Sequence, residues 1–136
     1  MRSWLSQIDE TLVQLATSDN AALWQIESGL RPGVQSLHRA AKWAIDNYSR
    51  QPLEVLSGSV PLLLQFGVVS GGWQMARAAL AAVRRLKQGR GKATFLQAKL
   101  NSARFYAAHV LPQVMALEEV VISGGPSVMA MDEASF

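Results

Sequence analysis

One stretch of the sequence constrains the fold more than any other: Val60–Leu86, VPLLLQFGVVSGGWQMARAALAAVRRL. It overlaps a run from Val55 to Ala76 that contains no charged residue, and it is rich in glycine and alanine. A helical segment that is apolar on all sides is stable in water only when other parts of a protein cover it. We therefore expect the rest of the chain to bury this segment.

A membrane-spanning helix is an alternative for the same stretch, because about 20 uncharged residues are long enough to cross a bilayer. Polar residues, a proline and four glycines interrupt it. The interrupting polar residues and proline are Ser57, Ser59, Pro61, Gln65, Ser70 and Gln74. Because these groups disfavour insertion, a core helix of a soluble bundle is the favoured interpretation. Membrane association through residues 53–87 is kept as the less favoured alternative.

Composition limits the class of protein. The chain has 136 residues, of which 49% are hydrophobic and 17% charged, enough for one folded domain with a core. It has no cysteine, which excludes disulfides and thiol catalysis and fits a reducing compartment. The N-terminus shows no secretion signal, so we expect a cytoplasmic location. The net charge is +3 with dispersed basic residues, which argues against nucleic acid as a partner.

Apolar residues recur at three- and four-residue steps along most of the chain, the period of amphipathic helices. This pattern predicts helices over residues 3–17, 21–48, 53–87 and 93–122, followed by a C-terminal tail over 123–136. Proline disrupts a helix interior, so we expect a kink or short break near Pro32 and kinks near Pro61 and Pro112. No strand pattern is visible. We predict a single all-α domain, an up-and-down antiparallel bundle of three long helices plus a shorter N-terminal helix.

Residue patterns for catalysis and metal binding are missing from the sequence. A di-iron bundle needs Glu-x-x-His pairs, and neither His38 nor His109 has a glutamate three residues before it. Ser36 and His38 are two residues apart on a predicted helix and therefore point to different faces. The glycine pairs follow no strand, so they do not indicate a phosphate-binding loop. We predict no catalytic residue and no metal ligand.

A basic cluster ends the third predicted helix, and it comprises Arg84, Arg85, Lys87, Arg90 and Lys92. Cations near a helix C-terminus interact favourably with the helix dipole, and this is the favoured interpretation. The alternative is a site for an anionic group, such as a nucleotide phosphate of a cofactor. Both interpretations remain open from the sequence.

Glycines concentrate inside the third predicted helix, where each costs about 1 kcal/mol relative to alanine and therefore needs a structural reason. Gly67 and Gly71 share one face, one turn apart, and Ala78 extends that low surface. We predict a tight helix–helix crossing there, inside the bundle or between subunits. Its contact residues are Gly67, Gly71, Gly72, Trp73 and Ala78.

Several runs of the sequence carry a family resemblance. They are VPLLLQFG at Val60–Gly67, GGWQMARAALAA at Gly71–Ala82, AKLNSARFYAAHVLPQ at Ala98–Gln113 and VMAMDEASF at Val128–Phe136. Together they resemble the C-terminal helical domain of acyl-CoA dehydrogenase-like flavoenzymes, in the branch that includes 3-methylmercaptopropionyl-CoA dehydrogenase. The clear similarity covers about residues 34–136.

The resemblance implies a function for the parent enzyme. Members of the family carry FAD, oxidise an acyl-CoA thioester between its α and β carbons, and assemble as dimers or higher oligomers. Their catalytic glutamate and most flavin and CoA contacts lie in a main body of several hundred residues, which this chain lacks. We therefore expect no catalytic residue and no bound cofactor in this chain alone, with FAD and the acyl-CoA substrate belonging to the parent enzyme.

The role that the resemblance implies for this chain is packing, oligomerisation or closure of the acyl-CoA site. The expected partners are the remainder of a dehydrogenase body and further copies in a homo-oligomer. Phe136 is expected to be a natural C-terminus and Met1 to lie partway through a larger protein, as in an isolated domain, a proteolytic remnant or a split-gene product. The alternative is a free-standing helical module for protein–protein interaction.

Overall fold

The structure is a computed structural model that describes residues 3–135, and these residues contain helices and no strand. The elements are α1 (Trp4–Ala16), α2 (Ala21–Asn47), α3 (Pro52–Ser57), α4 (Ser59–Lys87), α5 (Ala93–His109), α6 (Gln113–Ser123), α7 (Gly125–Met129) and a 3₁₀ turn, η1 (Glu133–Ser135). The predicted all-α class is confirmed.

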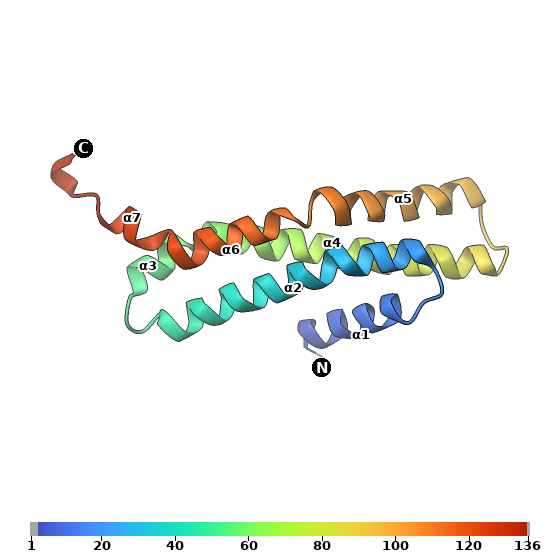
Figure 1. The fold of residues 1–136 in the computed structure, drawn as a ribbon, viewed down its shortest axis with the longest axis horizontal. Coiled ribbons are helices and arrows are strands. Elements are labelled where there is room, and N and C mark those ends of the chain that lie inside the picture. Colours follow the sequence, from blue (N-terminus) through green and yellow to red (C-terminus); the bar gives the residue numbers. More distant parts are fainter. Residues whose placement is uncertain (1–2, 136) are drawn as a thin grey trace.

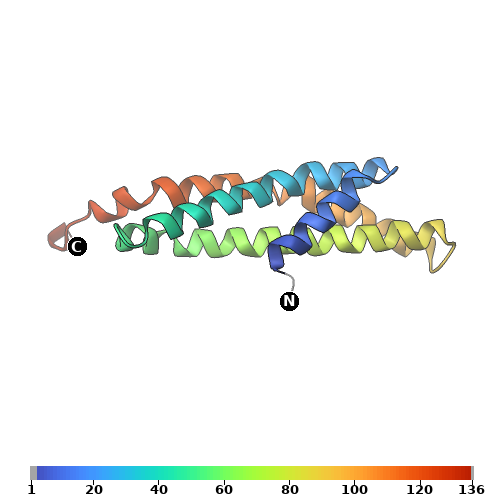
Figure 2. The ribbon, with the colours of Figure 1, turned by 90° about the horizontal axis from the view of Figure 1, so that it is seen from below.

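Three long helical segments run side by side along the molecule: α2, α4, and α5 followed by α6 (Figure 1). Each is antiparallel to the one before it, which gives an up-and-down bundle. The shorter α1 crosses obliquely over α2 and α4 and reaches only the middle of α4 (Figure 2). At the end of the bundle that carries the C-terminus, α3 packs against α7, and the C-terminal residues project beyond the bundle (Figure 1).

Local signals start the first two helices. The Ser3 side chain accepts a hydrogen bond from the Ser6 backbone N–H at 3.2 Å, and Asn20 Oδ1 accepts from the Ala22 N–H at 2.9 Å. Both side chains satisfy N–H groups that have no partner inside the helix. The turn from α4 to α5 contains Gly89 and Gly91 at φ values of 63° and 87°, a conformation that favours glycine.

The three prolines that were expected to interrupt helices have different effects. The predicted break at Pro32 is absent: α2 is continuous, because Leu30, Gly33 and Val34 are buried on either side of the exposed proline. The predicted helix 53–87 is two helices that meet at Gly58, and Pro61 lies in the first turn of α4. Proline is tolerated there because the first N–H groups of a helix lack partners anyway.

The predicted helix 93–122 is also two helices. It is interrupted at residues 110–112, where Pro112 removes a backbone donor, and α6 begins at Gln113. The predicted tail 123–136 is partly helical, because it contains α7 and η1. These corrections change the boundaries of elements and leave the order of the long segments as expected.

The break between α5 and α6 places Leu111 at the centre of the bundle. Leu111 is 1% exposed, and its side chain lies between two glycines, Gly33 of α2 and Gly72 of α4. A Cβ atom added at Gly72 would lie 2.8 Å from Leu111 Cδ2, whereas one added at Gly33 would lie 3.4 Å from it. The space left by Gly72 is therefore filled by Leu111.

A second close approach joins α2 to α5. A Cβ atom at Gly29 would lie 2.6 Å from the backbone oxygen of Ala107. Backbone cannot move aside as a side chain end can, so this position requires glycine. The buried apolar core extends around these crossings, with Ile8, Leu15, Leu30 and Val69 fully buried.

One polar cluster lies inside this apolar core and joins three helices. The Gln65 amide Nε2 donates to the Val114 carbonyl at 2.9 Å and to Ser36 Oγ at 3.3 Å, and both side chains are fully buried. Beside this cluster, Arg39 Nε and Nη2 donate to the two carboxylate oxygens of Glu118 at 2.6 and 2.8 Å. These contacts make a one-turn slip of α4 or α6 unfavourable, because it would leave buried polar groups unpaired.

The Leu111 contact can be tested by coupled substitutions. We expect Gly72→Ala to lower the free energy of unfolding by about 1–3 kcal/mol through overpacking, and Leu111→Ala to lower it by about 2–5 kcal/mol through a cavity. The double variant should lose less than the sum, because the alanine methyl group enters space vacated by the leucine. Urea unfolding of the four proteins measures this coupling.

Gly33→Ala is the matched control. Its added methyl group meets Leu111 at ordinary contact distance, so we expect no loss of stability and a gain of up to about 1 kcal/mol from helix propensity. Strict additivity of Gly72→Ala and Leu111→Ala would contradict the placement of Leu111.

Stability should also depend on the ionisation of Glu118. Hydrogen bonds from Arg39 hold the pKa of Glu118 below its ordinary value, against the opposing effect of burial. A carboxylate with a lowered folded-state pKa stabilises the fold above its unfolded pKa of about 4.3, and this contribution is lost as the pH falls through the folded value. Glu118→Gln should therefore be less stable than the native chain at pH 7, with the difference shrinking below about pH 4.

The measurement is urea unfolding of the native chain and of Glu118→Gln from pH 7 to pH 3. The neighbouring, exposed Glu119 provides the control substitution Glu119→Gln, for which we expect little change. A difference between native chain and Glu118→Gln that stays constant over this range would contradict the role of the ion pair.

Candidate functional site

The solvent-facing side of α4 is apolar and uncharged along most of its length. Residues at three- and four-residue steps share this side, and we name them the outer face of α4: Val60, Leu63, Leu64, Gly67, Ser70, Gln74 and Ala78. The exposed fractions of Val60, Leu63 and Leu64 are 65%, 70% and 53%. The first charged residue of α4 is Arg77, near the far end of this face. Contiguous apolar surface of this kind is typical of sites that bind other protein.

The structure separates the glycines that the sequence grouped together. Gly72 faces Leu111 in the core, and Gly71 packs against the hydroxyl end of Tyr106 from α5. Gly67 is exposed, with no atom within 4 Å of an added Cβ among the described residues, and Ala78 is also exposed. The crossing inside the chain thus uses Gly71 and Gly72, while Gly67 and Ala78 lie on the outer face of α4.

Two aromatic residues connect α4 to its neighbours. Tyr106 donates its hydroxyl to the Val68 carbonyl at 3.0 Å, and partial burial raises the pKa of this phenol. Trp73 is buried, and its indole Nε1 donates to Thr11 Oγ1 of α1 at 2.8 Å. The Arg77 guanidinium lies over the Trp73 ring, 5.2 Å from its centre. These contacts hold α4 against α1 and α5 and leave Val60, Leu63 and Leu64 exposed.

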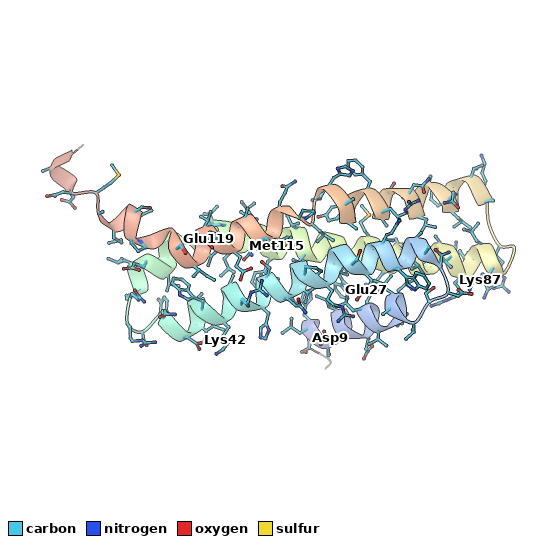
Figure 3. All side chains as sticks on the ribbon, viewed as in Figure 1. Asp9, Glu27, Lys42, Lys87, Met115 and Glu119 are labelled. Atoms are coloured by element: carbon cyan, nitrogen blue, oxygen red, sulfur yellow. The ribbon has the colours of Figure 1, made fainter. Side chains whose placement is uncertain are left out.

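The residues of the basic cluster lie in different surroundings. Lys87 lies at the end of α4 (Figure 3). Its Nζ forms an ion pair with Asp19 Oδ1 at 2.7 Å, which connects this end to the turn between α1 and α2. The hydrogen bond and charge of Lys87 hold the pKa of Asp19 below its ordinary value. Arg84 borders the groove between α1 and α4, whereas Arg90 and Lys92 lie in the following turn. Arg85 is exposed on the last turn of α4, where cations interact favourably with the helix dipole.

A groove of about 540 Å³ lies between α1 and α4. Its lining is Gln7, Glu10, Thr11, Gln14, Trp73, Arg77, Leu80, Ala81 and Arg84. Among residues 3–135 no three histidine or carboxylate side chains are grouped so that they could hold a metal ion. Ser36 is fully buried and its hydroxyl donates to the Val114 carbonyl, so it is inaccessible to a substrate.

Sequence reasoning missed the exposure of Val60, Leu63 and Leu64, which were expected to be covered by the other helices. The sequence did contain a signal for this exposure, the absence of charged residues from Val55 to Ala76. A helix whose one side faces solvent in a free monomer normally carries charged residues on that side. The Gln65 cluster was also missed. A lone amide inside an otherwise apolar run was the only sign of it in the sequence.

Length and composition identify one segment of the described residues that could cross a membrane, Ala93–Ser123, and 22% of its apolar window is buried in the bundle. The segment is divided into α5 and α6 by the break at residues 110–112. The stretch over 53–87, which the sequence suggested as the alternative membrane segment, does not meet this criterion.

Comparison with known proteins connects these surfaces to a family. A family model described as "Acetyl-CoA dehydrogenase C-terminal like" matches residues 4–132. The chain is 38% identical over 80 residues to 3-methylmercaptopropionyl-CoA dehydrogenase of Ruegeria pomeroyi, a match that covers 59% of this chain and 13% of that protein. It is 33% identical over 81 residues to the broad-specificity linear acyl-CoA dehydrogenase FadE5 of Mycobacterium tuberculosis, covering 58% of this chain and 13% of the relative.

The chain spans a small part of the curated relatives that it matches. The resemblance found in the sequence is confirmed, including the branch of the relative from Ruegeria. Because the family model covers residues 4–132, nearly the whole chain, this protein belongs to the acetyl-CoA dehydrogenase C-terminal-like family, the helical C-terminal domain of acyl-CoA dehydrogenases.

Proposed function

We propose that this chain is the non-catalytic helical part of an FAD-dependent acyl-CoA dehydrogenase and that its role is assembly of the enzyme. It would pack against the dehydrogenase body, hold subunits together and thereby help to close the acyl-CoA site. The observation that carries the proposal is the outer face of α4, whose large apolar side chains are exposed and uncharged. Such a face is stabilised when another protein surface removes it from water.

FAD and acyl-CoA belong to the parent enzyme in this proposal. An FAD pyrophosphate needs converging donors, such as backbone N–H groups of a glycine-rich loop or grouped arginines. Here Arg90 and Lys92 lie in the turn after α4, and Lys87 is already paired with Asp19. Gly71 and Gly72 lie in mid-helix against other side chains and offer no such loop. The residues present do not fit the cofactor, so we assign flavin binding and oxidation to the dehydrogenase body.

Acyl-CoA thioesters are the proposed substrate class of the parent enzyme, because both matched relatives are named as acyl-CoA dehydrogenases. Fatty acid or related acyl metabolism in the cytoplasm is the proposed setting. A free-standing interaction module is the second candidate, favoured by the chain's own buried core, in which Ile8, Leu15 and Leu30 are fully buried. The coding sequence upstream of Met1 distinguishes the two, since a dehydrogenase body encoded there supports the first.

Reconstitution tests the proposal. We expect the purified chain to be colourless and to show no acyl-CoA oxidation. Mixed with the body of a related dehydrogenase whose own C-terminal helices have been removed, it should bind and raise the activity and thermal stability of that body. Absorbance, a dye-linked acyl-CoA assay and thermal unfolding provide the measurements.

The control for reconstitution is a helical bundle of similar size from another family, which should neither bind the truncated body nor change its activity. Stoichiometric flavin on the isolated chain would overturn the non-catalytic assignment. Failure to bind any body of the matched branch would overturn the assembly role.

A further inference from the structure

The groove between α1 and α4 has two walls whose lining residues follow the same spacing. Gln7, Glu10 and Gln14 line it on α1, and Arg77, Leu80 and Arg84 line it on α4. Steps of three and four residues place each set on one side of its helix. Two such stripes next to each other form a groove of the kind in which a third helix packs, through its own residues at the same steps.

The groove continues along α4 beyond this first pocket. A second pocket, of about 430 Å³, shares Gln14, Leu80 and Arg84 with the first and extends to Asp19 and Lys87. Together the two pockets follow α4 from Trp73 to Lys87, which is about 21 Å of helix. This length accommodates about four turns of a helical ligand.

Two arginines border the groove at a fixed spacing. Arg77 and Arg84 are seven residues apart, which places them on nearly the same side of α4 with about 10 Å between them. Arg77 is oriented by the Trp73 ring and by one hydrogen bond, from Nη1 to Gln74 Oε1 at 3.1 Å, so most of its five donors remain available. Arg84 is exposed, and its guanidinium forms no ion pair within residues 3–135.

The surface between the two arginines is apolar. Leu80 and Ala81 lie three and four residues after Arg77, and Leu80 is half-buried against the bundle. Guanidinium groups bind carboxylates through two parallel hydrogen bonds. A matching ligand therefore presents two carboxylates about 10 Å apart with apolar side chains between them. A helix with acidic residues at positions i and i+7 and apolar residues at i+3 and i+4 has this arrangement.

The remaining charges of the groove favour a protein segment over nucleic acid. Glu10 lines the first pocket and Asp19 the second. A nucleic acid carries a phosphate at every step of its backbone and would bring like charges next to these carboxylates. A helical peptide can present neutral or basic side chains at the same two places.

We propose that the groove between α1 and α4 binds an acidic helical segment of a partner protein, whose two carboxylates pair with Arg77 and Arg84. None of the residues that line the groove belongs to the outer face of α4. The inference therefore goes beyond the assembly role and does not depend on it.

A synthetic helix provides the first test. The probe is a fluorescein-labelled peptide of about 18 residues, long enough to be helical, with glutamates at i and i+7 and leucines at i+3 and i+4. Fluorescence anisotropy should show saturable binding to the intact chain. A control peptide with glutamine in place of both glutamates should bind at least about tenfold more weakly, because it loses the charge-assisted pairs.

Two neighbouring arginines provide a matched pair of variants. Arg84→Gln should weaken binding of the glutamate peptide by about tenfold or more. Arg85→Gln removes the same charge one residue along the helix, at an exposed position that lines neither pocket, and should change the affinity by less than about twofold. Equal losses in the two variants would show attraction by net charge alone and would overturn the groove as the site.

Charge reversal tests the pairing directly. Arg84→Glu should abolish binding of the glutamate peptide, and a peptide with lysine in place of the glutamate at i+7 should recover most of the affinity. Arg84 is exposed, so both variants at this position should keep the circular dichroism spectrum of the native chain. Absence of this rescue would contradict the assignment of a carboxylate to Arg84.

A steric pair of variants locates the ligand independently of charge. Ala81→Phe fills the apolar surface between the arginines and should prevent binding, whereas Ala78→Phe adds the same side chain at an exposed position outside the groove and should not. Failure of the glutamate peptide to bind the native chain overturns the proposal. Tighter binding of a short DNA duplex of equal charge would overturn it in favour of a nucleic-acid site.

Discussion

The position of Leu111 between Gly33 and Gly72 is the contact on which the arrangement of the long helices depends. Leu111 belongs to the break between α5 and α6, so its side chain enters the bundle where the helical segment is interrupted. Val69 and Val114 lie beside it, each 0% exposed. Since a packed interior tolerates few voids, two missing side chains and one inserted leucine determine how closely α2 and α4 approach. The buried Gln65 amide then fixes the axial position of α4 relative to α2 and α6.

The fold class was predictable because it depends on a repeated pattern. Apolar residues at helical spacing predicted all-α structure, and caps at Ser3 and Asn20 are local signals of helix starts. The effects of proline were harder to predict, because they depend on packing far along the chain. Pro32 is held in a continuous helix by buried neighbours on both sides, whereas Pro112 accompanies a break whose Leu111 fills a specific space. No single-sequence rule distinguishes these two surroundings.

The candidate site was predictable only in part for the same reason. Gly67, Gly71 and Gly72 form one cluster in the sequence. Successive residues of a helix are rotated by about 100°, so Gly71 packs against Tyr106 and Gly72 against Leu111. Gly67 lies one turn before Gly71, beyond the contact with Tyr106, and faces solvent. The partner of Lys87 is Asp19, which lies 68 residues away along the chain. The glycines and the two charged residues are visible in the sequence. Which of them come together depends on the tertiary structure.

The limited reach of α1 has a consequence for how the molecule opens. Because α1 covers α2 and α4 along only part of their length, one portion of the bundle is buttressed by an additional helix and by the Trp73–Thr11 hydrogen bond. The other portion relies on α6 and on the short α3–α7 contact. Backbone amides there have less apolar cover against local opening, so their hydrogens should exchange with solvent at a lower opening free energy than those under α1. The two ends of the bundle therefore differ in local stability, and the end with the lower opening free energy carries the C-terminus.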